Sequence, residues 1–211
     1  MRKKGLFRMT VQCPHCHEES EHKVIDHINI DRTPEMREKV RDLSLFRVKC
    51  PNCGETVLAV HPCLYHDMSN GFMVWLWNEE EPVPTADFDP LAGYKLREVE
   101  TMNAFREKIA VLELGLDDRA VEIMKLLLLM RLRHDLDVVE LVFHELDART
   151  GDFRFVAVLS DGVEQYAAMP GALYQRLKQD VEERLFTSAK NFTRVDMDWA
   201  AQALELLHEA E

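Results

Sequence analysis

The spacing of hydrophobic residues predicts four helices in the second half of the chain. Residues 103–114 are apolar at helical spacing and end before Gly115, a residue suited to the left-handed end of a helix. Asp117 can cap a helix over 119–133, whose leucine run is apolar nearly all round and therefore predicts a central position in its domain. Two further helices are predicted over 170–185, opened by Pro170, and over 196–207, capped by Asp196.

Shorter segments between these helices have the patterns of β-strands. Residues 138–146, 153–159 and 163–168 are rich in β-branched and aromatic side chains, and the tight-turn pair Asp161-Gly162 joins the last two. Together the three segments predict an antiparallel meander.

The first third of the chain predicts strands around a short helix. Residues 24–30 are rich in β-branched side chains, and residues 72–77 are apolar on both faces, as expected of a buried strand. Between these segments Thr33 suits the N-cap of a helix, and Pro34 suits its first position.

A doubled phrase is the strongest chemical signal in the sequence: Cys13-Pro14-His15-Cys16 and Cys50-Pro51-Asn52-Cys53. Two thiols at this spacing can form a tight turn, or knuckle, and two knuckles supply the four tetrahedral ligands of a closed zinc site. Gly54 follows the second pair where the backbone often needs a positive φ, and His17 takes that position after the first pair. We therefore expect one structural Zn²⁺ held by Cys13, Cys16, Cys50 and Cys53.

The 33 residues between Cys16 and Cys50 are compatible with this site. Doubling a loop costs only about 0.6 kcal/mol, whereas structural zinc contributes on the order of 10–16 kcal/mol in small peptides. The phrase Cys-Pro-His-Cys taken alone also resembles the active site of oxidising thioredoxin-like proteins. Such a motif should precede a long helix, but here a charged segment and a predicted strand follow.

Residues 61–67 are the one local grouping of a nucleophile, bases and an acid. Cys63 with His66 or His61, and with Asp67 as the acid, could support thiolate catalysis if the side chains met in a cleft. The alternative is that Cys63 is a small core hydrophobe. The histidines of the first 77 residues are expected on the surface or beside the ligands, because four thiolates complete the site; they are His15, His17, His22, His27, His61 and His66.

Three prolines and an acidic cluster predict an exposed linker over 79–93. It would separate a zinc-ribbon-like, β-rich domain with an inserted short helix, over 8–78, from a domain over 94–211. The second domain would hold a helix pair, the antiparallel meander and the C-terminal helices. The predicted fold class is therefore α+β.

Composition and charge narrow the class of protein. The chain has 211 residues and is 46% hydrophobic and 30% charged, an ordinary globular composition. No apolar run is long enough for a membrane span or a signal peptide, so a cytoplasmic protein with reduced thiols is expected. Residues 1–77 carry 11 Lys and Arg against 10 Asp and Glu, and residues 78–211 carry 15 against 28. This balance disfavours nucleic acid as a partner.

The two Cys-Pro-X-Cys phrases, together with residues 64–67 and Gly115-Leu116-Asp117-Asp118-Arg119, resemble those of the CpXC domain family of bacteria and archaea. The resemblance covers residues 10–135. It implies a prokaryotic zinc-ribbon-like protein, and the family brings no established activity with it. The meander and the C-terminal helices lie outside the resemblance.

Three functions follow from these observations. A protein-interaction or scaffold module is favoured, because a closed ligand set leaves no metal position for water and the acidic second half suits a basic partner protein. An enzyme would use Cys63 with His66 and Asp67. A nucleic-acid-associated zinc-ribbon regulator would use the basic residues near the knuckles, which are Arg2, Lys3, Lys4, Arg8, Arg47 and Lys49.

Overall fold

The computed structural model describes residues 6–77, 93–185 and 191–209. The chain forms two compact units, the first within residues 1–106 and 189–192 and the second within 107–188 and 193–211. Helices and several separate sheets confirm the α+β fold class. Across the described residues, every helix is too short or too polar to cross a membrane. The predicted linker over 79–93 lies outside the described residues except for Gly93.

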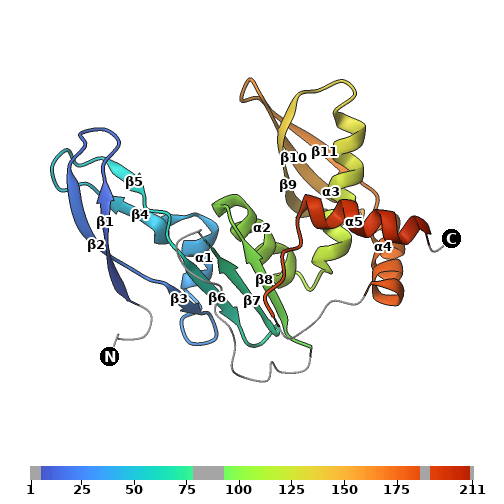
Figure 1. Ribbon diagram of the computed structural model, residues 1–211, viewed down its shortest axis with the longest axis horizontal. Helices are drawn as coiled ribbons and strands as arrows, with labels where there is room; N and C mark the ends of the chain where they lie inside the picture. The colour runs from blue at the N-terminus through green and yellow to red at the C-terminus, as the bar shows by residue number, and fades with distance from the viewer. Residues whose placement is uncertain (1–5, 78–92, 186–190, 210–211) are drawn as a thin grey trace. The chain divides into compact units, whose positions relative to one another are not determined.

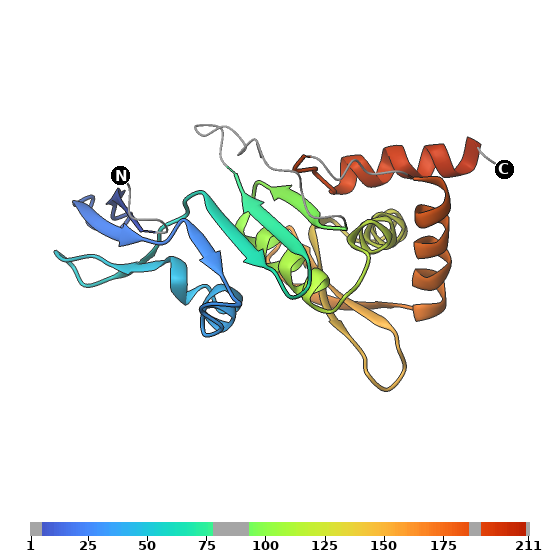
Figure 2. The same cartoon turned by 90° about the horizontal axis from the view of Figure 1, so that it is seen from below.

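Two short antiparallel hairpins form one end of the first unit (Figures 1 and 2). Strand β1 (Phe7–Gln12) pairs with β2 (Glu19–Val24), and β4 (Arg47–Lys49) pairs with β5 (Thr56–Leu58). Each hairpin turns at one of the Cys-Pro-X-Cys phrases. Isolated two-stranded sheets are marginally stable at best, so these hairpins need support beyond their own ladders.

A four-stranded sheet forms the other part of the first unit. Its spatial order is β3 (His27–Asn29), β6 (Cys63–Asp67), β7 (Phe72–Leu76) and β8 (Lys95–Val99). Strands β6 and β7 are antiparallel, whereas β3 and β8 run parallel to their neighbours. Strand β7 is buried along most of its length, which confirms the prediction from its apolar run.

The insertion between the cysteine pairs contains α1 (Met36–Arg41) and the 3₁₀ turn η1 (Ser44–Phe46). The predicted helix is present, but the prediction that Thr33 caps it is wrong. Thr33 Oγ1 donates to the carbonyl of Asn29 at 2.8 Å, and turns stabilised by the Asn29 side chain precede the helix.

The predicted single strand over 24–30 is also wrong, because it is divided between the end of β2 and β3. The carbonyls of the two intervening residues have partners outside these strands. Ile25 O lies 2.9 Å from His61 Nε2, and Asp26 O accepts from the Leu64 amide at 2.8 Å.

Aromatic rings fill the core of the first unit. The ring of Phe105, in α2 (Met102–Glu113), lies 6.2 Å from that of Phe46 and 6.5 Å from that of Tyr65.

Both β8 and Phe105 follow the expected linker in sequence, yet they complete the sheet and the core of the first unit. The compact units divide inside α2, after Arg106, whereas the sequence places the boundary at the linker. Parallel pairing of β7 with β8 joins segments on either side of that linker.

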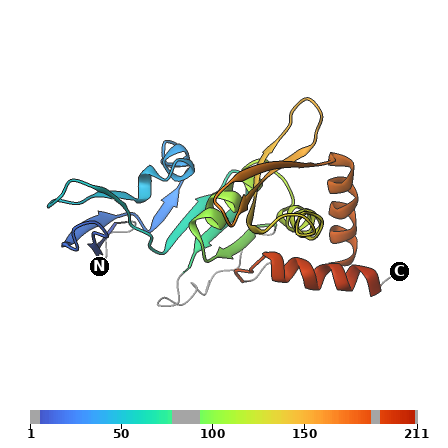
Figure 3. The ribbon, with the colours of Figure 1, turned by 90° about the horizontal axis from the view of Figure 1, so that it is seen from above.

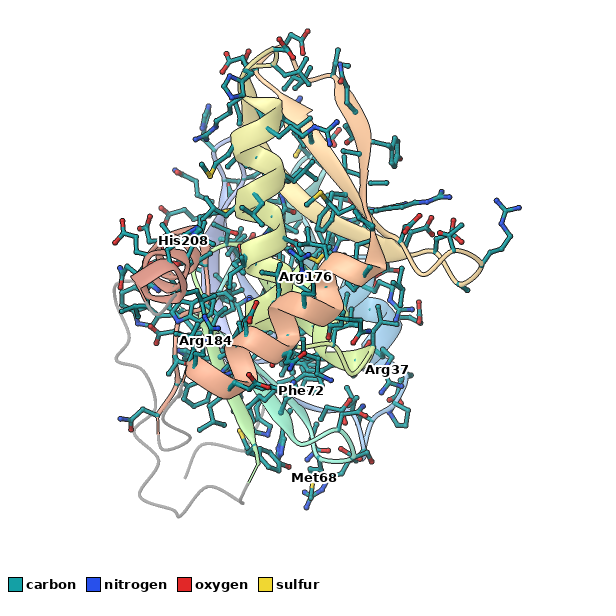
Figure 4. All side chains as sticks on the ribbon, turned by 90° about the vertical axis from the view of Figure 1, so that its right-hand side faces the viewer. Arg37, Met68, Phe72, Arg176, Arg184 and His208 are labelled. Atoms are coloured by element: carbon teal, nitrogen blue, oxygen red, sulfur yellow. The ribbon has the colours of Figure 1, made fainter. Side chains whose placement is uncertain are left out.

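The four helices from α2 onward begin and end within two residues of the positions that the sequence predicts. Helix α2 stops at Gly115, which has φ +69°, and Asp117 caps α3 (Asp118–Leu132) by accepting the Arg119 amide. Helix α4 (Gly171–Arg184) follows Pro170, and Asp196 precedes α5 (Met197–Glu209). Figure 4 shows Arg184 near the end of α5, where its Nη1 donates to Leu207 O at 3.4 Å.

The predicted meander is confirmed. Strands β9 (Val138–Leu146), β10 (Phe153–Leu159) and β11 (Glu164–Met169) form a three-stranded antiparallel sheet in the order β11-β10-β9. Its inner face packs into one hydrophobic core with α3, α4 and α5. Helix α3 contacts β9, α4 and α5, as expected of a central helix, and Figure 3 shows it beside the meander strands.

Helix α3 contains buried charged residues that its apolar sequence pattern does not predict. They belong to a buried ionic network of Glu107, Lys108, Asp118, Glu122 and Lys125, all with exposed fractions of 9% or less. Lys125 Nζ lies 2.7 Å from Glu107 and 3.1 Å from Glu122, and Lys108 Nζ lies 3.3 Å from Asp118. The network therefore ties α2 to α3 inside the second unit.

Candidate metal centre

The first cysteine pair occupies the turn between β1 and β2. The Cys13 amide donates to Glu18 O at 2.9 Å, and the His17 amide donates to Cys13 O at 2.8 Å. His17 has φ 60°, in the left-handed region that favours glycine. These bonds fold residues 13–18 into a tight knuckle.

The second pair repeats this geometry between β4 and β5. The Cys50 amide donates to Glu55 O at 2.8 Å, and the Gly54 amide donates to Cys50 O at 3.0 Å. Gly54 has φ 77°, close to the value at His17. The two phrases therefore fold into matching knuckles, and the positive φ expected after each pair is present.

The knuckles bring the four thiols together. The Sγ atoms of Cys13 and Cys53 are 3.6 Å apart, those of Cys16 and Cys50 are also 3.6 Å apart, and all four lie within 4.8 Å of one another. A disulfide would require about 2.05 Å, whereas a tetrahedral metal with bonds of about 2.3 Å places its sulfurs about 3.8 Å apart. The separations fit four ligands of one metal ion.

Hydrogen bonds and crowding set the charge state of the thiols. The backbone amide of Glu18 lowers the pKa of Cys16 to about 6. At Cys53 the equivalent amide, of Glu55, also favours the thiolate, but burial and the neighbouring thiols raise the pKa to about 12. Adjacent thiolates repel one another, so full ionisation needs a cation at the centre. The donor set therefore suits a thiophilic metal ion.

Histidine is absent from this ligand group. Among the described residues, the one cluster of potential metal ligands consists of the four cysteines. His22 Nε2 instead lies 2.8 Å from Ser20 Oγ. Strand β2 follows the first pair, so the helix that thioredoxin-like chemistry needs after Cys-Pro-X-Cys is not there.

A buried histidine connects the two hairpins, and the expectation that His61 lies on the surface or beside the metal ligands is wrong. The His61 ring lies 5.6 Å from that of Phe7 and 5.2 Å from that of Phe46. Its Nδ1 lies 2.8 Å from Ala59 O and its Nε2 2.9 Å from Ile25 O. His61 thus joins the segment after β5 to the end of β2.

Cys63 and His66 do not meet. They are three residues apart on β6, so their side chains face opposite sides of the sheet. Cys63 is fully buried, and burial raises the pKa of its thiol. His66 Nε2 lies 3.0 Å from the Tyr94 hydroxyl, and burial lowers the pKa of this ring. Cys63 Sγ instead donates to Ile25 O at 3.6 Å, the same carbonyl that lies 2.9 Å from His61 Nε2, so the thiol and the His61 ring each have this backbone oxygen as a partner.

Asp67 has a role in the turn after β6. Its Oδ1 accepts the Asn70 amide at 2.9 Å, its Oδ2 accepts from Asn70 Nδ2 at 2.7 Å, and Arg37 lies 3.6 Å away. These contacts hold the turn between β6 and β7. The geometry around residues 61–67 is that of a packed sheet.

Comparison with known proteins supplies the family. No curated protein and no solved structure matches the chain. A family model described as CpXC protein matches residues 11–125, which is more than half of the sequence and includes both knuckles. The chain therefore belongs to the CpXC protein family.

Proposed function

We propose that the four cysteines bind one structural Zn²⁺ and that the zinc-ribbon-like hairpins around it form a protein-interaction or scaffold module. The observation that supports the metal most directly is the cluster of four Sγ atoms within 4.8 Å, supplied by two matching knuckles. Four thiolates in a tetrahedron are typical of structural zinc. Such a set leaves no open coordination position for substrate or water.

The size of the hairpins explains why a metal is needed. Strands β4 and β5 have three residues each, and the first hairpin alternates exposed with partly buried residues along most of its length. Little apolar area is therefore available to hold the knuckles together. A metal at their tips would contribute on the order of 10–16 kcal/mol, far more than the ladders of two short hairpins.

Exposed apolar side chains favour a binding role for the hairpins. Leu58 on β5 is 43% exposed, and Val60, which follows that strand, is 51% exposed. The charges of the hairpins do not favour nucleic acid as the partner, because four basic residues are matched by four glutamates in the same hairpins. The basic residues are Arg8, Lys23, Arg47 and Lys49. A protein surface with complementary apolar side chains is the partner that these residues suit.

Metal analysis of the purified protein tests the proposed centre. We expect one zinc per chain, loss of hairpin amide protection on addition of a strong chelator, and the same loss in Cys50→Ser. Cys63→Ala is the matched control, because this thiol is buried outside the cluster, and it should retain one zinc. A folded, metal-free protein would refute the centre, and one iron per chain with visible absorption would refute zinc as its metal.

The interaction role has a separate test. Replacing Leu58 and Val60 by serine should leave the zinc content unchanged but abolish enrichment of a partner captured from the native host. The comparison is made with the Leu206→Ser variant, which alters an exposed apolar residue on α5. Equal capture by all variants would refute the assignment of the hairpins as the binding surface.

A further inference from the structure

Strand β11 leaves one edge of the meander open. It is the terminal strand of its sheet, and in the described part of the chain only β10 pairs with it (Figure 1). The opposite edge, on β9, is partly occupied because the Glu107 carboxylate accepts the Phe143 amide. Unpaired backbone groups on a strand edge are a template for another strand.

The register identifies the open backbone groups. The Leu159 amide donates to Val163 O at 2.9 Å, and the β10–β11 pairing then continues without a bulge. Alternate residues of an antiparallel strand direct their backbone groups to opposite sides. The amides and carbonyls of Glu164, Tyr166 and Ala168 therefore point away from β10.

This edge lacks the usual protection. Strand β11 contains no proline, lysine or bulge, although natural edge strands commonly use these features against pairing. Tyr166 is 67% exposed, and its ring lies 5.4 Å from His144 on β9, back across the sheet. The tyrosine ring thus leans inward over the sheet face, away from the free edge.

We propose that β11 pairs with β11 of a second copy of this chain. The strands would run antiparallel about a two-fold axis at Tyr166, so that Tyr166 faces the partner's Tyr166 and Glu164 faces the partner's Ala168. In this register the residues whose backbone groups point away from β10 face the same set of residues in the partner, and each facing pair exchanges two backbone hydrogen bonds. The two three-stranded meanders become one continuous sheet.

Charge complementarity selects a second copy as the occupant. Ala168 is the register partner of Arg154 on β10, so the row across the new interface reads Glu164, the partner's Ala168 and the partner's Arg154. Strands lie about 4.8 Å apart, and the small alanine leaves the space between glutamate and arginine open. The Arg154 side chain is 46% exposed and already binds Glu145 on β9 and Asp147, which follows that strand. Two such Glu164–Arg154 pairs form by symmetry, and no like charges face each other.

The contact area predicts a reversible dimer. One strand edge and its flanking side chains bury less surface than an obligate dimer interface. We therefore expect monomer and dimer to exchange in the micromolar range, about 1–100 µM.

Sedimentation velocity on the full, metal-replete chain tests the proposal. The mass should rise with concentration from 24.6 kDa toward twice that value. Ala168→Pro removes an outward amide that β10 does not use, so the variant should fold and remain monomeric. Glu164→Arg should weaken the dimer roughly tenfold by placing arginine near the partner's Arg154.

Mixing two variants gives the sharpest test. Glu164→Arg and Arg154→Glu should each dimerise about tenfold more weakly than the wild type when alone, and their mixture should recover the wild-type affinity, because each charge pair across the mixed interface is then opposite. Glu205→Arg on α5 makes the same charge change elsewhere and should dimerise like the wild type. A wild type that stays monomeric at about 100 µM, a dimer unaffected by Ala168→Pro, or a mixture that dimerises no more tightly than either variant alone would each overturn the proposal.

Discussion

The buried ionic network gives a sharp test of how the second unit is held together. In the Lys125→Met variant the side chain keeps much of its volume but loses its charge. Glu107 and Glu122 then lose partners at 2.7 Å and 3.1 Å, in surroundings where neither carboxylate reaches water freely. Removing one partner of a buried pair leaves an uncompensated charge, which costs about 3–5 kcal/mol.

The pKa shifts of the pair support the direction of that effect. Burial alone would lower the pKa of Lys125, but the carboxylates of Glu107 and Glu122 outweigh it and raise this pKa above its ordinary value. Burial acts on Glu107 in the opposite sense and raises its pKa. The charge of Lys125 opposes this rise in the pKa of Glu107.

Urea denaturation followed by far-UV circular dichroism, with amide exchange in α3, measures the effect. We expect the second-unit transition of Lys125→Met to lose about 3–5 kcal/mol, or at least about 12 °C in Tm. Lys178→Met is the control, since Lys178 makes an exposed pair with Glu182 and should cost about 1 kcal/mol or less. Adding Glu107→Gln to Lys125→Met should recover part of the loss, because the amide oxygen can still accept from Phe143. Equal costs for Lys125→Met and Lys178→Met would show that the network is not sequestered from water.

Three further predictions follow from local geometry. His17→Gly should stabilise the first knuckle by about 0.5–1 kcal/mol in chemical denaturation and keep the metal content unchanged, since His17 holds a positive φ and is outside the ligand cluster; loss of metal would contradict this. Gly171→Ala should cost about 1–3 kcal/mol, because its Cβ would lie 2.3 Å from Gly151 O, whereas the exposed Ala172→Gly should cost about 1 kcal/mol or less. The pKa of His66 is lowered by burial and then by the charges of His27 and Arg32, against the opposing charges of Asp31 and Asp67. The stability that His66 contributes is therefore present above about pH 6.5 and is lost as the pH falls through its folded pKa. Between about pH 7 and 5 the free energy of unfolding should therefore fall more steeply with decreasing pH in the wild type than in His66→Gln. Equal slopes for the two proteins would refute the assignment.

Local chemistry made the knuckles and the second unit predictable from the sequence. A Cys-Pro-X-Cys phrase closes its own turn, and Gly115, Asp117, Asp161-Gly162 and Asp196 mark boundaries through bonds to near neighbours. Features that depend on partners distant in sequence leave no local signal. The pairing of β7 with β8 spans the linker, and its parallel direction leaves no turn signal in the sequence.

Buried charges were missed for a related reason. The pattern of 119–133 shows how apolar α3 is, but not that Glu107 lies 18 residues earlier in sequence and 2.7 Å away from Lys125 in space. In the same way, the adjacency of Cys63, His66 and Asp67 suggested a chemical grouping, and the alternation of side chains along β6 separates the thiol from His66.

Helix α2 affects how the protein can be divided for study. Phe105 is part of the aromatic cluster of the first unit, while Glu107 and Lys108, within the next turn, hold the second. A fragment cut at residues 79–93 would lose β8 and expose the rings of Phe46 and Tyr65, which now pack on Phe105. Expression boundaries chosen from the proline-rich stretch would therefore yield an aggregation-prone front piece, so a truncation should retain this helix in both halves.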